Sequence, residues 1–240
     1  MEFNIFQKYP QLVYGLSRIS DGPMKLKHNS NADKSVQENR KKFLNKNQIQ
    51  INDLIAAKLA HRNNIKNVFK EDKGRCIENS DELITTEKNI YLTFTVADCF
   101  PVFLFDPVNN IIGLMHIGWG GASKGIIENI IKLILYYTRN NISNLLVEIG
   151  PGLQVCHFEV KNDLVVVFKE FPNQIINKNN KKYLNLSQII KNKFNRAGVA
   201  VKNVEVDGDC TYCKKSEYFS YRRNKSRKLK TMMAFIGINK

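Results

Sequence analysis

The sequence predicts an α+β fold in which a mixed β-sheet is flanked by helices. Short apolar runs rich in β-branched and aromatic residues, typical of buried strands, alternate with amphipathic segments but lack the regular spacing of βαβ units. No Pro-, Gly- or Ser-rich linker divides the 240 residues, a length that suits one large domain. We therefore expect residues 1–240 to form a single layered domain.

Two apolar runs within Tyr91–Gly121, joined by a turn signal at residues 106–110, predict a central β-hairpin. Other strands are expected at residues 12–16, 65–69, 145–149, 199–206 and 231–238, and a short buried element at residues 81–85. The stretch 51–59 has no clear period. Helices are expected from an Asp33 cap to about Leu44, and over residues 122–139, 159–171 and 186–197. The helix at 122–139 has the clearest pattern, with isoleucines at 126, 127, 130, 131 and 134.

The composition is basic, with a formal net charge of +15 and a pI near 9.6. Such a charge suggests nucleic-acid binding. The lysines, however, are spread over the whole chain with many Asn and Ile residues, as in the solvated run 178–182, which favours a coding bias. A binding protein that grips RNA through residues 214–230 is the non-enzymatic alternative. An anionic small substrate would be attracted in either case.

Cysteine usage and the chain start predict a cytoplasmic protein. Five cysteines are an odd number, which favours reduced thiols. The first ten residues contain no apolar core of the kind a secretory signal has. No apolar run approaches the roughly eighteen residues of a membrane helix, so we expect no membrane partner.

Cys99 and His116 are the first chemical candidates. Asp98 and Cys99 lie in the middle of the first apolar run, and His116 ends the second, just before a glycine-rich turn. Cys99 and His116 could form a nucleophile and its base, or could join His61 in a zinc site with two imidazoles and one thiolate. Asp98 would point away from Cys99 in a regular strand, so a catalytic role for it requires a local break. A buried thiol, a hydrogen-bonded histidine and a structural carboxylate are the alternatives.

Other motifs carry weaker signals. Cys210 and Cys213 form a lone CxxC, which is weak as a zinc ribbon and more typical of two core thiols in a turn. Arg222 and Arg223 follow aromatic residues and could hold a phosphate beside a stacked base, or lie in a solvated loop. The glycine-rich start of the 122–139 helix, with Ser123, suits an anion or is a plain turn.

Four segments together resemble a known family. They are Thr-Val-Ala-Asp-Cys-Phe-Pro at 95–101, His-Ile-Gly-Trp-Gly-Gly at 116–121, Glu-Ile-Gly-Pro-Gly at 148–152 with Cys156 and Glu159-Val160, and residues 210–223. They are similar to the multicopper polyphenol oxidase (laccase) domain family, whose members are also described as zinc-dependent purine nucleoside phosphorylases and, in bacteria, as peptidoglycan editing factors. Their order and spacing match over residues 80–238. The amino-terminal third matches less closely, through Arg18, Glu38-Asn39-Arg40 and His61.

The resemblance implies a sandwich in which sheets lie between helical layers, similar to the putative cysteine hydrolase fold of a cytotoxic necrotizing factor-like toxin. It implies zinc held by His61, Cys99 and His116, with Asp98, Cys99 and His116 as the catalytic residues. The implied reactions are phosphorolysis of adenosine, inosine, guanosine and methylthioadenosine, and deamination of adenosine. Arg18, Arg222 and Arg223 are candidates to hold phosphate. The expected partners are thus a purine nucleoside and phosphate, with no specific nucleic acid.

Copper is a less suitable metal, because four histidines are too few for a multicopper centre. The chain also departs from the family pattern at three places. Gly120 replaces an Arg or Lys, Leu59-Ala60-His61-Arg62 replaces Gln-Val-His-Gly, and the Gly-Gly-Val-Ser that follows Arg18 in the family is absent. We expect an altered substrate pocket. The leading rival is a metal-free hydrolase or amidase that uses Cys99 and His116 on cell-wall precursors.

Overall fold

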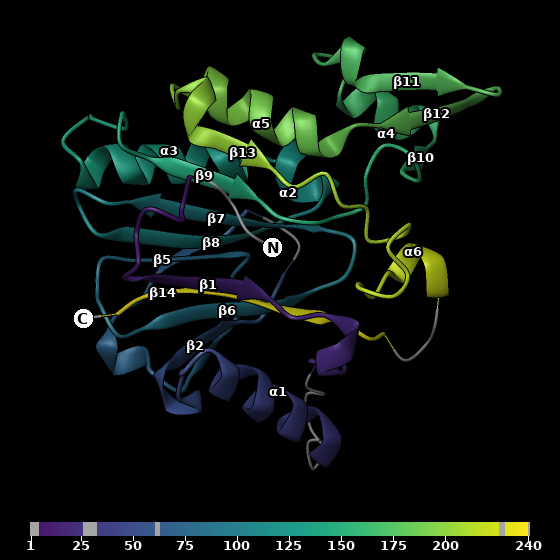
Figure 1. The fold of residues 1–240 in the computed structure, drawn as a ribbon. Helices are drawn as coiled ribbons and strands as arrows, with labels where there is room; N and C mark the ends of the chain where they lie inside the picture. Colours follow the sequence, from purple (N-terminus) through teal and green to yellow (C-terminus); the bar gives the residue numbers. More distant parts are fainter. Residues whose placement is uncertain (1–4, 26–32, 61–62, 226–228, 240) are drawn as a thin grey trace.

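Two mixed β-sheets lie face to face between helical layers in the computed structural model, which describes residues 5–25, 33–60, 63–225 and 229–239 (Figure 1). From one side to the other, the layers are α3 (Ile126–Tyr137) with α5 (Leu186–Arg196), a six-stranded sheet, a five-stranded sheet, and α1 (Lys34–Lys46). This arrangement confirms the predicted mixture of helices and mixed sheets. The likeness to the toxin domain stays a prediction.

The six-stranded sheet contains the predicted hairpin. Its strands, in spatial order, are β13 (Val204–Val206), β9 (Leu146–Ile149), β7 (Phe100–Asp106), β8 (Ile111–Ile117), β5 (Glu82–Thr85) and β3 (Ile65–Asn67). The outer pairs β13·β9 and β3·β5 are parallel and the others antiparallel. Asp106 closes the hairpin turn, since its Oδ1 accepts hydrogen bonds from the backbone N–H groups of Val108 and Asn109, both at 2.9 Å.

The five-stranded sheet joins the two ends of the chain. Its order is β1 (Leu12–Leu16), β14 (Met232–Ile238), β6 (Tyr91–Val96), β2 (Leu54–Ala57) and β4 (Cys76–Ile77). β2 runs parallel to β6 and β4, and the other pairs are antiparallel. The ambiguous stretch 51–59 is a 3-10 turn followed by strand β2.

Two predicted helices differ from the structure. The segment 122–139 forms two helices, α2 (Trp119–Ser123) and α3, because Gly125 adopts a left-handed φ of 81° between them. The segment 159–171 forms β10 (Glu159–Val160) and the short α4 (Asn162–Val167). α6 (Tyr221–Asn224) was not predicted. The 3-10 turns are Ile19–Asp21, Ile51–Asp53, Lys70–Asp72, Pro172–Gln174 and Val201–Asn203.

A small antiparallel sheet lies at one end of the molecule, beside α4 (Figure 1). Its order is β10, β12 (Lys181–Leu184) and β11 (Ile175–Lys178). Asn179 and Asn180 link β11 to β12 with φ values of 50° and 58°, the positive angles that two-residue hairpin turns require. The lysine run interpreted as solvated surface is thus the exposed tip of a hairpin.

Three apolar cores separate the layers. One lies between α3, α5 and the six-stranded sheet, the second between the two sheets, and the third between the five-stranded sheet and α1. α1 begins at its predicted cap, where Asp33 Oδ1 accepts a hydrogen bond from the Ser35 N–H at 3.1 Å. Within the described ranges, no helix is both long and apolar enough to cross a membrane.

Candidate functional site

The chain crosses from the five-stranded to the six-stranded sheet at a short turn that carries Asp98 and Cys99. β6 ends at Val96 and β7 begins at Phe100. Asp98 has a φ of 79°, which is uncommon for a residue other than glycine and is typical of turns and functional sites. The prediction that Asp98 and Cys99 lie in the middle of one strand is therefore wrong. The apolar run is two strands of different sheets, and Asp98 lies at the break.

Asp98 holds this turn through three other segments. Its Oδ1 accepts a hydrogen bond from Thr211 Oγ1 at 2.7 Å, and its Oδ2 accepts one from the Arg222 backbone N–H at 2.6 Å. Its carbonyl oxygen accepts a third from the Leu153 N–H at 2.8 Å. These bonds offset the cost of the left-handed backbone, about 1–3 kcal/mol. Asp98 therefore fixes the position of the neighbouring Cys99.

Cys99, in the turn directly before β7, and His116, near the end of β8, line the same cavity. Phe100 pairs with Ile117 in the register of the hairpin, so Cys99 lies next to Gly118. A Cβ atom on Gly118 would lie 2.9 Å from the Cys99 sulfur, too close for a normal contact. Glycine at this position is what leaves space for the thiol.

The surroundings of the two side chains are largely apolar. The His116 ring packs edge-to-face on Phe94, with ring centroids 5.6 Å apart, and its backbone N–H donates to the Asp81 carbonyl at 2.9 Å. Burial, with a smaller contribution from the Asp98 carboxylate, raises the pKa of Cys99 to about 12. The thiol is therefore neutral at physiological pH unless a cation, such as a metal ion, binds to it. A thiol and an imidazole facing one cavity are donors that fit zinc.

The cavity has a volume of about 820 Å³ and lies beside the five-stranded sheet. Its wall includes residues 93–97 of β6 and the turn after it, Ala56 and Ala57 of β2, and the aromatic side chain of Tyr221. Its volume falls within the roughly 300–1,000 Å³ of small-molecule sites. A nucleoside-sized ligand would fit here.

The charged residues that line the cavity are all cationic among the described residues. They are Lys25, Arg40, Lys58 and Arg75. Arg40 is buried, where it donates from Nη1 to the Met24 carbonyl at 3.1 Å, and burial lowers its pKa. Lys58 Nζ lies 2.8 Å from Glu78 Oε2, and Arg75 Nη1 lies 3.6 Å from Asp72 Oδ1. The wall attracts anions.

The predicted phosphate-binding arginines lie elsewhere among the described residues: none of Arg18, Arg222 and Arg223 lines the cavity. Arg18 forms an ion pair with Glu217 and lies over the Tyr218 ring at 5.4 Å. Arg222 lies next to Cys99 through its backbone N–H, which bonds to Asp98, and the assignment of the three arginines to phosphate stays a prediction. Of the cavity cations Lys25, Arg40, Lys58 and Arg75, Arg40 belongs to a segment that resembles the family, Glu38-Asn39-Arg40.

The guanidinium groups of Arg222 and Arg223 donate to backbone carbonyls. Arg222 Nη1 donates to Glu159 at 3.2 Å. Arg223 donates to Thr211 and Tyr218, each at 2.7 Å, and to Tyr212 at 3.0 Å. These contacts hold the loops around α6.

His61, the third predicted zinc ligand, lies outside the described residues. The chain leading to it reaches the site, because Leu59 lines the cavity. The Ala60 N–H donates to Asp81 Oδ1 at 3.0 Å. The backbone carbonyl of the same Asp81 accepts a hydrogen bond from the His116 N–H. The segment before His61 is thus anchored beside His116.

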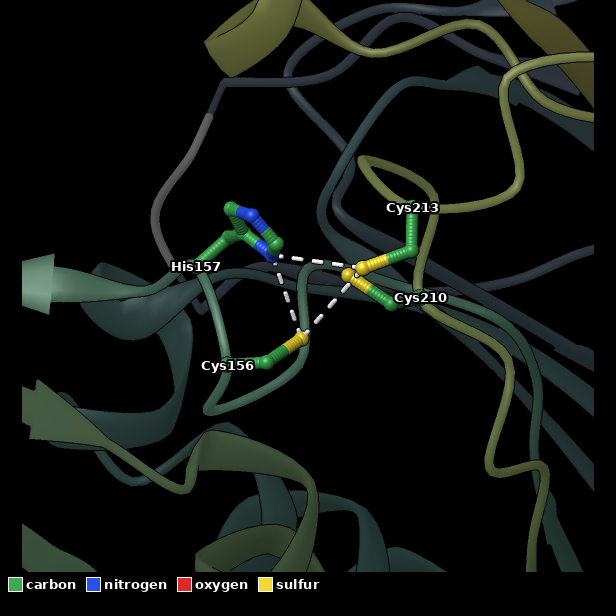
Figure 2. Close-up of side chains that lie close together, drawn as sticks. All are labelled: Cys156, His157, Cys210 and Cys213. Carbon is green, nitrogen blue, oxygen red and sulfur yellow. Dashed lines mark hydrogen bonds between the residues drawn. The ribbon is translucent and has the colours of Figure 1, made fainter.

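A second group of metal-binding side chains consists of Cys156, His157, Cys210 and Cys213, which we call the Cys₃His cluster (Figure 2). Their sulfur and nitrogen atoms all lie within 4.8 Å of one another, so they could hold a metal ion. From the sequence, Cys210 and Cys213 were interpreted as two thiols in a turn, and His157 had no predicted role. The sequence does not show that the segment of Cys156 and His157 folds next to the segment of Cys210 and Cys213.

The thiols of this cluster differ in their surroundings. Burial and hydrogen bonds with Cys210 and Cys213 raise the pKa of Cys156 to about 12. Burial alone would raise the pKa of Cys210, but hydrogen bonds from the backbone N–H groups of Gln154 and Cys213, among others, lower it. Cys210 is therefore the thiol best suited to lose its proton.

Comparison with known proteins identifies relatives across nearly the whole chain. A family model described as multi-copper polyphenol oxidoreductase laccase matches residues 20–239. Purine nucleoside phosphorylase YlmD of Bacillus subtilis is 27% identical over 223 residues, which cover 88% of this chain and 80% of that protein. Purine nucleoside phosphorylase RP494 of Rickettsia prowazekii is 33% identical over 185 residues, 74% of each chain.

Solved structures share the fold. The hypothetical protein YfiH of Bacillus licheniformis superposes with a TM-score of 0.88 at 25% identity, covering 97% of this chain and 95% of its own. YlmD of Geobacillus stearothermophilus gives a TM-score of 0.89 at 24% identity, with 98% and 94% covered. The layered arrangement of two sheets and flanking helices is thus common to these proteins.

Proposed function

The chain belongs to the multi-copper polyphenol oxidoreductase laccase family, and on this basis we propose that it is a purine nucleoside phosphorylase whose reaction takes place in the cavity at Cys99 and His116. The observation that carries the proposal is the combination, in one cavity, of a thiol, an imidazole and a cationic wall. Relatives that are named purine nucleoside phosphorylases support the choice of reaction.

The wall supplies binding groups for both substrates. Phosphorolysis requires phosphate to be held against the anomeric carbon of the ribose, and Arg40, Lys58 and Arg75 provide positive charge for this. Tyr221, an exposed side chain of the wall, offers aromatic surface for the purine. These cations take the role that the sequence analysis gave to Arg18, Arg222 and Arg223.

His61, Cys99 and His116 are the residues that would hold zinc. When bound, the zinc ion supplies Lewis-acid polarisation to a substrate oxygen. Gly118 keeps the space around the Cys99 sulfur open, and His116 is held against Phe94. Asp98 acts by positioning, because its carboxylate is bonded to Thr211 and Arg222 and holds the turn of Cys99.

The residues of the chain also account for the charge that develops as the bond breaks. Phosphate oxygen attacks the anomeric carbon, the bond to the purine nitrogen breaks, and its electron pair leaves with the purine. The cationic wall offsets this negative charge. Deamination of adenosine and phosphorolysis of methylthioadenosine, in the same cavity, are further reactions that we propose.

Product analysis by mass spectrometry tests the proposal. The full chain, loaded with zinc, is incubated with adenosine, inosine or methylthioadenosine, with and without phosphate. Phosphorolysis is supported if free base and ribose 1-phosphate, or its methylthio analogue, form only with phosphate. Deamination is supported if adenosine yields inosine. Cys99→Ala should abolish both. Absence of turnover with all three nucleosides would refute the proposal.

Zinc content and the rate at which Cys99 is alkylated separate the rival hydrolase. A metal-free enzyme that uses Cys99 and His116 would hold no zinc, and its Cys99 would be alkylated rapidly. The burial that raises the pKa of Cys99 argues against a free thiolate nucleophile. Cell-wall precursors would be the substrates to assay if nucleosides are not turned over.

A further inference from the structure

We propose that the Cys₃His cluster is a structural zinc site, separate from the cavity at Cys99, which clips the segment 153–160 to the segment 207–224. None of its four residues lines the cavity. The four side chains converge on one point from two loops (Figure 2). Three thiolates and one imidazole are a ligand set typical of structural zinc.

The distances among the donor atoms of Cys156, His157 and Cys213 are close to those of a tetrahedral ion, and the Cys210 sulfur lies within 4.8 Å of each of them. With zinc–sulfur bonds of about 2.3 Å and zinc–nitrogen bonds of about 2.0–2.1 Å, tetrahedral geometry places two sulfurs about 3.8 Å apart and a sulfur and a nitrogen about 3.6 Å apart. The Cys156 and Cys213 sulfurs are 3.7 Å apart. His157 Nδ1 lies 3.3 Å from each of these two sulfurs. A disulfide would need the sulfurs at about 2.05 Å.

Local backbone structure explains how adjacent residues can bind one ion. In a strand, Cys156 and His157 would point to opposite faces. Here they lie in a tight turn, in which the N–H groups of His157 and Phe158 both donate to the Gln154 carbonyl at 3.0 Å. The turn therefore directs both side chains to the same side.

The second loop is closed by its own backbone and is bonded to the first loop. The N–H of Lys214 donates to the Cys210 carbonyl at 3.0 Å and closes the CxxC turn. The Gln154 side chain donates from Nε2 to the Asp207 carbonyl at 3.0 Å, and the Thr211 N–H donates to the Gly152 carbonyl at 3.0 Å. These bonds hold the two loops side by side without an ion.

The proposed zinc ion would stabilise the turn of Cys99 without touching substrate. Thr211, next to Cys210, is bonded to Asp98, and the Tyr212 ring stacks on His157 with centroids 4.0 Å apart. Arg222 bonds to Asp98 and to the Glu159 carbonyl. The cluster thus joins the two loops from which the partners of Asp98 extend.

X-ray absorption at the zinc edge tests the site in the full chain. We would use Cys99→Ala, loaded with zinc and dialysed, so that the cavity lacks its own thiol ligand. We expect a tightly held zinc with three sulfurs at about 2.3 Å and one nitrogen at about 2.0–2.1 Å. Adding Cys213→Ser should remove this zinc or its third sulfur. Adding Cys76→Ser, a change at an exposed thiol of the cavity wall and outside the cluster, should leave the spectrum unchanged and so show that the sulfurs do not come from the cavity.

The spectrum of Cys99→Ala decides the matter even if Cys213→Ser fails to fold. A dialysed protein without zinc, a zinc shell without sulfur, or a Cys156–Cys213 disulfide found by peptide mapping would each overturn the proposal. The readout does not depend on turnover. A failure of nucleoside phosphorolysis would therefore leave this result intact, and the reverse also holds.

Discussion

Gly118→Ala is expected to damage the site far more than the fold. The added Cβ would lie 2.9 Å from the Cys99 sulfur, whereas an ordinary van der Waals contact begins near 3.4 Å, so the sulfur must move by about 0.5 Å. The moving atom is the end of a side chain, so the free energy of unfolding should fall by only about 1 kcal/mol. Metal–ligand distances usually lie within about 0.2 Å of their ideal values. Since a misplacement of about 1 Å can cost about 100-fold, a shift of about 0.5 Å should lower kcat/KM about tenfold.

Gly208→Ala is the matched control, since a Cβ at Gly208 meets no atom within 4 Å. The assay measures zinc per chain after dialysis, kcat/KM for inosine, and thermal unfolding, for both variants and the parent protein. We expect Gly118→Ala to lose zinc at Cys99 and activity while unfolding within a few degrees of the parent. Equal activity and zinc content in the two variants would refute the account of how Cys99 is placed.

Three further predictions concern the cavity wall, the α6 loops and a buried carboxyl. Arg75→Ala and Lys58→Ala should each raise the KM for phosphate about tenfold with a smaller change in kcat, because cationic side chains of the cavity wall are lost; a similar rise in Arg18→Ala would contradict the assignment. Arg223→Ala should lower the free energy of unfolding by about 2 kcal/mol, because three carbonyls lose their charged donor, and an unchanged denaturation midpoint would speak against this. Burial, with a smaller contribution from the Glu205 carboxyl, raises the pKa of Glu148 to about 10. The folded state therefore retains a proton that the unfolded chain releases above about pH 4.5. The free energy of unfolding should fall as pH rises from about 4.5 to about 10, by up to roughly 1.4 kcal/mol per pH unit from this carboxyl. Glu148→Gln should flatten that slope in denaturant unfolding measured at several pH values, and an unchanged slope would show that Glu148 is not its source.

The hairpin and the helices α1, α3 and α5 could be predicted because their signals are local. The Asp106 turn and the isoleucine spacing of α3 lie within a few residues of the structure they determine. The break at Asp98 could not be read from the run 91–105, since two buried strands of different sheets have the same apolar composition as one. The Asn179-Asn180 turn did carry a local signal, which the lysines on either side obscured.

The candidate site was only partly predictable, because it is assembled from distant segments. Cys99 and His116 belong to one hairpin, and the family motifs indicated them. The cavity cations lie on α1 and near β2 and β4, which only the folded sheet brings together. The Cys₃His cluster joins residues 57 positions apart. Arg222 and Arg223 were predicted to bind phosphate because of their charge, but their guanidinium groups donate hydrogen bonds to backbone carbonyls.

The rate of hypoxanthine release from inosine, measured against phosphate concentration with the zinc-loaded full chain, shows whether phosphorolysis takes place in the cavity at Cys99. We expect a rate that saturates with phosphate, falls to zero without it, and vanishes in Cys99→Ala at every concentration. Release that is independent of phosphate, or that persists in Cys99→Ala, would contradict the assignment of phosphorolysis to this cavity.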